Sequence, residues 1–353
     1  MSRKFYMALY VLLPVLVIAF IVVVRKNLQP PDAPDPQPSP KTGTQPDDHT
    51  PSPATAEREP ERAPPAPAMR GLDAYRHAGL ALPPTLKQRL PEHGSGILVA
   101  PELKLILWSY RDREPVPIAS MTKMMSLLLV AEAVNRRDDV DYDTVTTVSR
   151  RAEAVGGSQV WLMAGHRYPL HKLCRAAAVK SANDAMFAAA EAVAPGGDNG
   201  RFVAFMNRRA RRLGMRYARF YNVHGLPTPR GRPDNRASCR GLVLLAVELR
   251  RHERVCNWLQ TETSEFVHGN DKVVKIRNTN HDLLTRCPGV DGMKTGYTRK
   301  AGFCVTASCR RDGRRLLAIG TGFPDKDRRF LFISGLFAFG FERLPQFLPA
   351  TAP

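Results

Sequence analysis

Residues 30–67 contain thirteen of the 30 prolines in this 353-residue chain and no aromatic residue. A segment of this composition buries too little apolar surface to fold, and its prolines keep the backbone extended. In polyproline geometry it reaches on the order of 100 Å. We therefore predict a disordered linker at 29–70. The folded domain is expected at 71–345, followed by a short tail at 346–353.

The segment before this linker is one long apolar run. Residues 6–24 are uncharged and long enough for a helix to cross a bilayer. A cleaved signal peptide would show a shorter apolar region and a small-residue cleavage site, whereas Val24 leads directly into Arg25 and Lys26. We predict a short cytoplasmic tail and an N-terminal transmembrane signal anchor over 1–28, with the folded domain exported.

The folded part shows strand patterns near both of its ends and helical patterns between them. The strand patterns occupy 94–101, 103–110, 271–278, 302–311 and 314–323. Helical patterns dominate 145–260, and 330–341 predicts a closing helix. We predict an α+β fold in which strands from both ends form one antiparallel sheet. Helices flank this sheet, and a helical lobe lies beside it.

The formal net charge of +19 indicates an anionic partner or surface. No nucleic-acid-binding motif accompanies the charge, so we expect no nucleic-acid partner. The arginine-rich stretch 199–220 places apolar residues on one helical face and arginines on the other, which is typical of a solvated amphipathic helix.

The cysteine and histidine spacings argue against a metal. The six cysteines include no C-x-x-C pair, and the nine histidines form no H-E-x-x-H motif. We therefore expect no metal and no cofactor. Buried free cysteines are the simplest expectation, and one or two disulfides are the alternative for an exported domain.

Residues 116–130, VPIASMTKMMSLLLV, form an apolar run in which Lys123 is the one charged residue. A buried ammonium is costly unless it is paired or loses its proton. Residues three apart share a helix face, so Lys123 can reach the hydroxyl of Ser120 and act as its base. In the alternative interpretation, Ser120 caps the helix and Lys123 extends to solvent.

Two further stretches combine polar residues with a setting that suits a binding site. Ser181 and Asn183 interrupt the Ala-rich helical pattern at 176–194, either as part of a site or as the junction between two helices. Lys294 and Thr295 precede a glycine in a β-like stretch, where a ligand can approach a strand edge and its carboxylate can be held.

In the folded part, S-x-x-K, S-x-N and K-T-G follow one another in this order. With their flanks they resemble the low-molecular-mass penicillin-binding proteins of the D-alanyl-D-alanine carboxypeptidase family. The similarity runs through nearly all of 95–345 and includes the stretches PIASMTKMM, SANDA, NVHGLP and DGMKTGYTRKAGFC. It implies a serine-type enzyme with a β-lactamase/transpeptidase-like fold.

The resemblance also implies roles for individual residues. Those implied in catalysis are Ser120 as the acyl-ester nucleophile, Lys123 as the general base, Ser181 as a proton relay and Asn183 as the residue that positions the substrate amide. Those implied in substrate binding are Lys294 and Thr295 at the substrate carboxylate, the adjoining Gly296, Tyr297, whose backbone N–H joins that of Ser120 in an oxyanion hole, and Arg329 as a carboxylate clamp.

The implied reaction removes the terminal D-alanine from peptidoglycan stem peptides that end in D-Ala-D-Ala, through an acyl-enzyme on Ser120. β-Lactam antibiotics would acylate the same serine. The expected location is the bacterial inner membrane, single-pass, with the catalytic domain on the periplasmic side. Two alternatives stay open: a D,D-endopeptidase that cleaves peptidoglycan cross-links, and a non-catalytic module that binds penicillin or cell wall.

Overall fold

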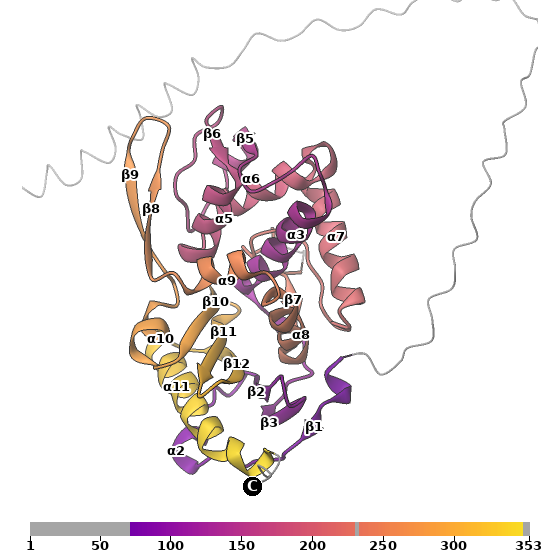
Figure 1. The fold of residues 1–353 in the computed structure, drawn as a ribbon, viewed down its shortest axis with the longest axis vertical. Coiled ribbons are helices and arrows are strands. Elements are labelled where there is room, and N and C mark those ends of the chain that lie inside the picture. The colour runs from indigo at the N-terminus through magenta and orange to yellow at the C-terminus, as the bar shows by residue number, and fades with distance from the viewer. Residues whose placement is uncertain (1–70, 230–232, 349–353) are drawn as a thin grey trace, which may run out of the picture. The chain divides into compact units, whose positions relative to one another are not determined.

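The computed structural model describes residues 71–229 and 233–348 (Figure 1). The predicted signal anchor at 1–28, the linker at 29–70 and most of the tail at 346–353 lie outside the described residues. Among the described residues, no helix is both long enough and apolar enough to cross a bilayer.

A six-stranded sheet in the order β1-β3-β2-β12-β11-β10 forms one part of the domain. Its strands are β1 (Arg76–His77), β2 (Gly96–Ala100), β3 (Leu105–Tyr110), β10 (Val290–Thr298), β11 (Gly302–Arg311) and β12 (Arg314–Phe323). The predicted union of N-terminal and C-terminal strands is confirmed. The prediction of a wholly antiparallel sheet is wrong at β1, which runs parallel to β3. The two residues of β1 are polar and show no alternation that could predict a strand.

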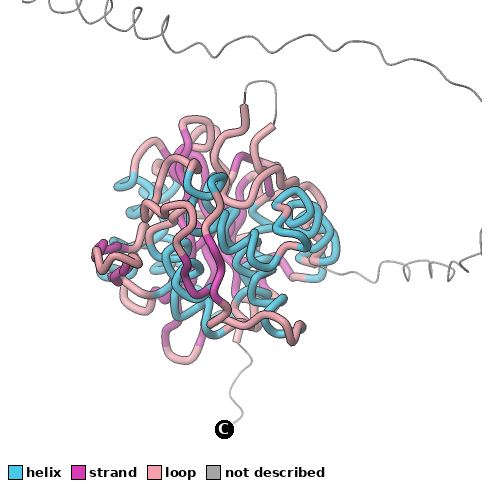
Figure 2. The backbone as a smooth tube through the Cα atoms, turned by 90° about the horizontal axis from the view of Figure 1, so that it is seen from above, coloured by secondary structure: helices cyan, strands magenta, loops and turns pink. Residues whose placement is uncertain are grey.

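Both faces of this sheet are buried. Ile97 and Val99 of β2 belong to the hydrophobic cluster of the helical lobe, whereas Leu98 and Ala100 pack in a second cluster with α11 (Lys326–Arg343). Figure 2 shows helices on either side of the central strands. This arrangement explains the continuous apolar stretch in β2, because alternate residues enter different cores.

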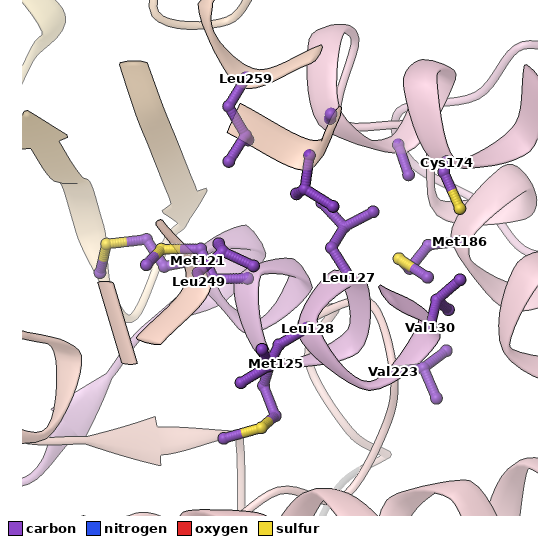
Figure 3. Packing of buried hydrophobic residues seen from close by; sticks show 14 of the residues in the cluster. Met121, Met125, Leu127, Leu128, Val130, Cys174, Met186, Val223, Leu249 and Leu259 are labelled. Carbon is purple, nitrogen blue, oxygen red and sulfur yellow. The ribbon is translucent and has the colours of Figure 1, made fainter. Parts of the chain in front are cut away.

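The helical lobe surrounds α3, the helix that follows Ser120 and begins at Lys123. Its elements are η2 (Ala119–Thr122), α3 (Lys123–Arg136), α4 (Arg150–Glu153), α5 (Leu170–Val179), α6 (Asn183–Val193), α7 (Asn199–Arg212), α8 (Cys239–Leu249) and α9 (Glu253–Gln260). Figure 3 shows Met125, Leu127 and Leu128 of α3 among side chains of neighbouring elements, including Cys174 and Met186. The part of the apolar run that follows Ser120 is therefore a buried helix.

A separate hairpin, β8 (Thr263–Val267) and β9 (Val273–Arg277), extends from the lobe (Figure 1). The prediction that the 271–278 strand joins the main sheet is wrong. In β9, Ile276 is buried while Val273 is half exposed, so the strand covers one surface of the lobe and faces solvent on the other side.

The remaining elements are short connections around the two parts. They are η1 (Leu72–Ala74), α2 (Pro84–Lys87), β4 (Val116–Pro117) paired with β7 (Arg236–Ala237), β5 (Val145–Thr147) paired with β6 (Arg167–Pro169), η3 (Pro195–Gly197), α10 (His281–Arg286) and η4 (Leu344–Phe347).

All six cysteines lie in the described residues, and each is unpaired. Burial raises the pKa of the Cys174 thiol to about 12 and that of Cys304 to about 11. Thiols in this state carry little thiolate at neutral pH and behave as small apolar side chains.

Candidate active site

Ser120 lies on η2, a tight turn that leads into α3. The α-helix itself begins at Lys123, and the residue before the serine, Ala119, has a φ of 45°. Within the described residues the hydroxyl of Ser120 accepts no hydrogen bond from a backbone N–H, so the interpretation of this serine as a helix cap is wrong.

Two glycines from distant parts of the chain hold this turn in place. A Cβ on Gly296 of β10 would lie 2.7 Å from the carbonyl oxygen of Ile118 and 3.1 Å from the backbone nitrogen of Ser120. A Cβ on Gly225, whose φ is +88°, would overlap the carbonyl oxygen of Ala119. The close approach of both segments therefore requires glycine, and their packing sets the position of the nucleophile.

Lys123 is fully buried, and its Nζ has three oxygen neighbours. They are Ser120 Oγ at 2.9 Å, Asn183 Oδ1 at 2.6 Å and the carbonyl oxygen of His224 at 2.7 Å. Burial lowers the pKa of Lys123 well below its ordinary value, and the nearby charge of Lys294 lowers it further. A neutral amine has two N–H groups, which Asn183 and His224 accept, so its lone pair is left for the hydroxyl of Ser120.

The S-x-N segment places its two polar side chains between α5 and α6. Asn183 opens α6, and its Nδ2 donates to the carbonyl oxygen of Gly156 at 2.8 Å. Ser181 has a φ of 63°, and its buried hydroxyl has no hydrogen-bond partner among the described residues. The junction predicted from the Ala-rich pattern is therefore confirmed, and it leaves one hydroxyl available to a ligand.

Asp184 supports this segment in a way that its sequence position did not reveal. It is fully buried, and its carboxylate accepts the N–H groups of Val160, Leu162 and Ala185 at 2.8–3.2 Å. By its position alone, Asp184 is an acidic residue in the first turn of α6. The bonds from Val160 and Leu162 tie the loop before α5 to the helix that carries Asn183, and the bond from Ala185 lies within that helix.

Replacement of Asp184 with asparagine is expected to lower the free energy of unfolding by about 2–3 kcal/mol, because an amide NH₂ would then face backbone N–H donors. Urea denaturation measures this change. The exposed Glu153 on α4, which forms no ion pair within the described residues, offers the control. Glu153→Gln should change the unfolding free energy by less than about 0.5 kcal/mol, and equal effects of the two variants would contradict the expectation.

The K-T-G segment lies on β10, at the free edge of the sheet. Lys294 Nζ donates to Thr279 Oγ1 at 3.2 Å, and Thr295 Oγ1 donates to the same oxygen at 2.7 Å. Thr279 was not predicted as a site residue, because only the fold brings it beside β10. Burial and the charge of Arg329 lower the pKa of Lys294 to about 7.

Arg329 lies in the first turn of α11, near enough to Lys294 to affect its pKa. Its side chain is buried, and among the described residues its Nε has no hydrogen-bond partner. The adjacent Arg328 is exposed and pairs with Asp325, so the geometry favours Arg329 as the cation at this site. Tyr297 follows Gly296 at the strand edge and is 57% exposed.

The structure thus brings together the S-x-x-K turn, the S-x-N junction, the K-T-G strand and Arg329. Among the described residues, no group of three or more His, Cys, Asp or Glu side chains could hold a metal ion. The arrangement can place an acyl carbon near Ser120, a proton acceptor at Lys123 and an anionic ligand near Lys294. These are the parts that nucleophilic acyl transfer requires.

Comparison with known proteins gives one consistent result. Residues 88–323 match the Peptidase_S11 family, D-alanyl-D-alanine carboxypeptidase. The chain is 32% identical over 252 residues to the D-alanyl-D-alanine carboxypeptidase DacF of Bacillus subtilis, with 71% of this chain and 63% of that relative covered. The chain therefore spans less than two thirds of the length of that relative.

Two solved structures share the fold. Penicillin binding protein 6B from Escherichia coli has a TM-score of 0.64 and 28% identity, with 74% of this chain and 79% of that chain covered. Penicillin-Binding Protein D2 from Listeria monocytogenes, in its ampicillin-bound form, has a TM-score of 0.61 and 26% identity over 70% of this chain and 96% of that chain. The fold, the site geometry and the match over 88–323 together show that the chain belongs to the D-alanyl-D-alanine carboxypeptidase family.

Proposed function

We propose that this chain is a serine-type D-Ala-D-Ala carboxypeptidase that removes the terminal D-alanine from peptidoglycan stem peptides. One observation carries the proposal: Ser120 Oγ lies 2.9 Å from the amine of the buried Lys123, whose pKa is lowered. A buried lysine of this kind is a base for serine and not a surface charge. Membership of the family supports the substrate class.

In the proposed acylation step, Ser120 Oγ attacks the carbonyl carbon between the two D-alanines while Lys123 Nζ takes its proton. The oxyanion of the tetrahedral intermediate accepts hydrogen bonds from the backbone N–H groups of Ser120 and Tyr297. Collapse of the intermediate breaks the C–N bond, and the proton passes through the hydroxyl of Ser181 to the leaving amine. Free D-alanine departs, and water then hydrolyses the ester to restore Ser120.

Substrate binding is proposed to use the free edge of β10. An extended peptide can add to this edge by backbone hydrogen bonds, with its terminal carboxylate at Lys294, Thr295 and Arg329. Asn183 would position the substrate amide. β-Lactams, which the relative from Listeria monocytogenes binds in the form of ampicillin, would acylate Ser120 and act as covalent inhibitors.

The pKa of Lys294 predicts how acylation depends on pH. Lys294 binds a carboxylate only when protonated, so acylation of the free enzyme should fall above about pH 7, by about tenfold for each pH unit. Lys123 can take the proton of Ser120 only when it is neutral. Because its pKa is lowered, the rate of acylation should begin to fall only at a lower pH than for an ordinary lysine. The second-order rate of labelling by a fluorescent penicillin, measured from about pH 5 to about pH 9, tests this profile.

Lys294→Arg is the matched variant for the pH profile, because a guanidinium stays protonated throughout this range. Its labelling rate should lose the decline above neutrality. A wild-type rate that stays constant from pH 7 upward would contradict the assignment of Lys294 to carboxylate binding.

The reaction itself is tested with two natural substrates. The purified protein is incubated with a pentapeptide that ends in D-Ala-D-Ala and with a cross-linked peptide dimer, and released D-alanine and cleaved dimer are quantified. We expect D-alanine from the pentapeptide. Cleavage of the dimer alone would indicate an endopeptidase, and penicillin labelling of Ser120 without turnover of either substrate would indicate a binding module.

We further propose that residues 6–24 anchor the protein in the bacterial inner membrane by a single pass, with the catalytic domain on the periplasmic side. The uncharged apolar run and the proline-rich segment that follows it support this proposal. Reporter fusions at the C-terminus test it: alkaline phosphatase should be active and a cytoplasmic reporter inactive. The opposite pattern would contradict the orientation.

A further inference from the structure

A groove of about 410 Å³ lies between α3 and α7, remote from the nucleophile. It borders α3 around Ala133, about ten residues and 15 Å along the helix from Lys123. Its apolar lining consists of Leu129, Ala133, Val193, Pro195, Phe202 and Phe205. The size and the apolar walls are typical of a ligand site.

Five arginines line the same groove, and not all of them are neutralised. Arg209 pairs with Glu132 and Glu248, both at 2.6 Å, so it belongs to the scaffold. Arg208 and Arg212 are exposed, and within residues 71–229 and 233–348 neither pairs with a carboxylate. Two positive charges are therefore available at the rim of an apolar groove.

Arg208 also joins the polar rim to the apolar floor, because its guanidinium lies 5.1 Å from the centre of the Phe205 ring. Beyond the groove, exposed arginines continue along and after α7 at Arg201, Arg211 and Arg216. Arg201 and Arg216 pair with Asp198 and Asp73, whereas Arg211 forms no ion pair within the described residues. The interpretation of 199–220 as a solvated amphipathic helix accounts for the arginines, but it does not account for an open apolar groove beneath them.

We propose that this groove binds an anionic phospholipid. The phosphate accepts hydrogen bonds from Arg208 and Arg212, whose planar guanidinium groups suit phosphate oxygens, and part of an acyl chain lies over the half-buried Ala133 and Phe205. Free phosphate would use the rim and leave the apolar floor exposed. An uncharged lipid would leave the two arginines without a partner. An anionic lipid is the ligand that satisfies both, and neighbouring arginines strengthen its attraction to a lipid surface.

A soluble lipid probe tests the proposal on the full chain in a neutral detergent. Calorimetric titration with dihexanoyl phosphatidylglycerol is compared with dihexanoyl phosphatidylcholine and with inorganic phosphate, all at one ionic strength. We expect the anionic lipid to bind at least tenfold more tightly than either comparison ligand. Equal affinity for inorganic phosphate would overturn the assignment of a lipid, and equal affinity for phosphatidylcholine would overturn the role of the charges.

Two variants locate the binding. Arg208→Gln with Arg212→Gln should weaken the anionic lipid by about thirtyfold, because each cation near an anionic lipid surface contributes about fivefold. The matched control is Arg310→Gln with Arg314→Gln, which removes two exposed arginines near the β11–β12 turn. The control should bind the anionic lipid as tightly as the wild type does. An equal loss of affinity in both variants would show that the net charge of the protein, and not the groove, determines binding.

Ala133→Trp fills the groove and leaves every arginine in place. It should weaken the anionic lipid at least fivefold without changing the binding of inorganic phosphate. Retention of full lipid affinity would overturn the role of the groove. Unchanged melting temperatures confirm that the variants are folded. If Ala133→Trp is unstable, the comparison of the double arginine variant with its control still tests the proposal.

Discussion

Replacing Ser120 with alanine is expected to abolish covalent labelling by a fluorescent penicillin and to lower D-alanine release by at least about a thousandfold. The melting temperature should change little. The hydroxyl of Ser120 caps no helix, and among the described residues its hydrogen bond is with Lys123, which keeps two other oxygen acceptors. Gel fluorescence, mass spectrometry of the labelled peptide and thermal denaturation together measure the outcome.

Ser126, on the following helix α3, provides the matched control. Its buried hydroxyl donates to the carbonyl oxygen of Val223 at 2.6 Å, so Ser126→Ala should lower the free energy of unfolding by about 1–3 kcal/mol. Labelling should persist, because this hydroxyl bonds the Val223 carbonyl oxygen and makes no hydrogen bond to Lys123. Labelling of the Ser120→Ala protein, or a large loss of its stability, would contradict the role of Ser120 as nucleophile.

Replacing Gly225 with alanine is expected to disrupt both the fold and the site. A left-handed φ of +88° costs a non-glycine residue about 1–2 kcal/mol, and the added Cβ overlaps the carbonyl oxygen of Ala119. Together we expect the free energy of unfolding to fall by about 3–5 kcal/mol. Labelling should also slow at a temperature where the variant is folded, because the clash moves the turn that carries Ser120. Urea denaturation and labelling rates measure the two effects.

Gly156 is the matched control for this variant. It lies in an exposed loop of the same lobe, has no positive φ, and an added Cβ would meet no atom within 4 Å. Its carbonyl oxygen still accepts from Asn183 when alanine replaces it. Gly156→Ala should therefore leave stability and labelling near wild-type values. Equal tolerance of alanine at both glycines would show that the Ser120 turn is not held by the close packing described here.

The pairing of Ser120 with Lys123 could be predicted from the sequence as one of two interpretations, because a lone charge in an apolar helix is costly to bury. The roles of the individual residues were implied by the resemblance to the family. Lys123 stands alone as a charge in an apolar helix, and its separation from Ser120 by three residues places both on one side. The interruption at Ser181 and Asn183 likewise predicted the junction that the structure shows. In each case the departure from an ordinary helical pattern identified the residue.

The rest depends on contacts between distant segments, which a single sequence does not reveal. The α-helix begins at Lys123 and not at Ser120, because Gly225 and Gly296 hold the preceding turn from outside. The position of Asp184 indicates only an acid in the first turn of α6, and its role depends on N–H groups of the distant loop before α5. Thr279 has no local signal, since it meets Lys294 only after the sheet forms.

The burial of Lys123 and Lys294 also couples folding to proton release. In the unfolded chain each amine keeps its proton up to its ordinary pKa of 10.5, whereas in the folded chain both pKa values are lowered, that of Lys294 to about 7. Between these values the folded state holds fewer protons, so the free energy of unfolding rises with pH. A substrate carboxylate draws a proton back to Lys294 when it binds. The domain therefore gains stability in the alkaline range where it loses its hold on substrate, and substrate binding itself takes up a proton.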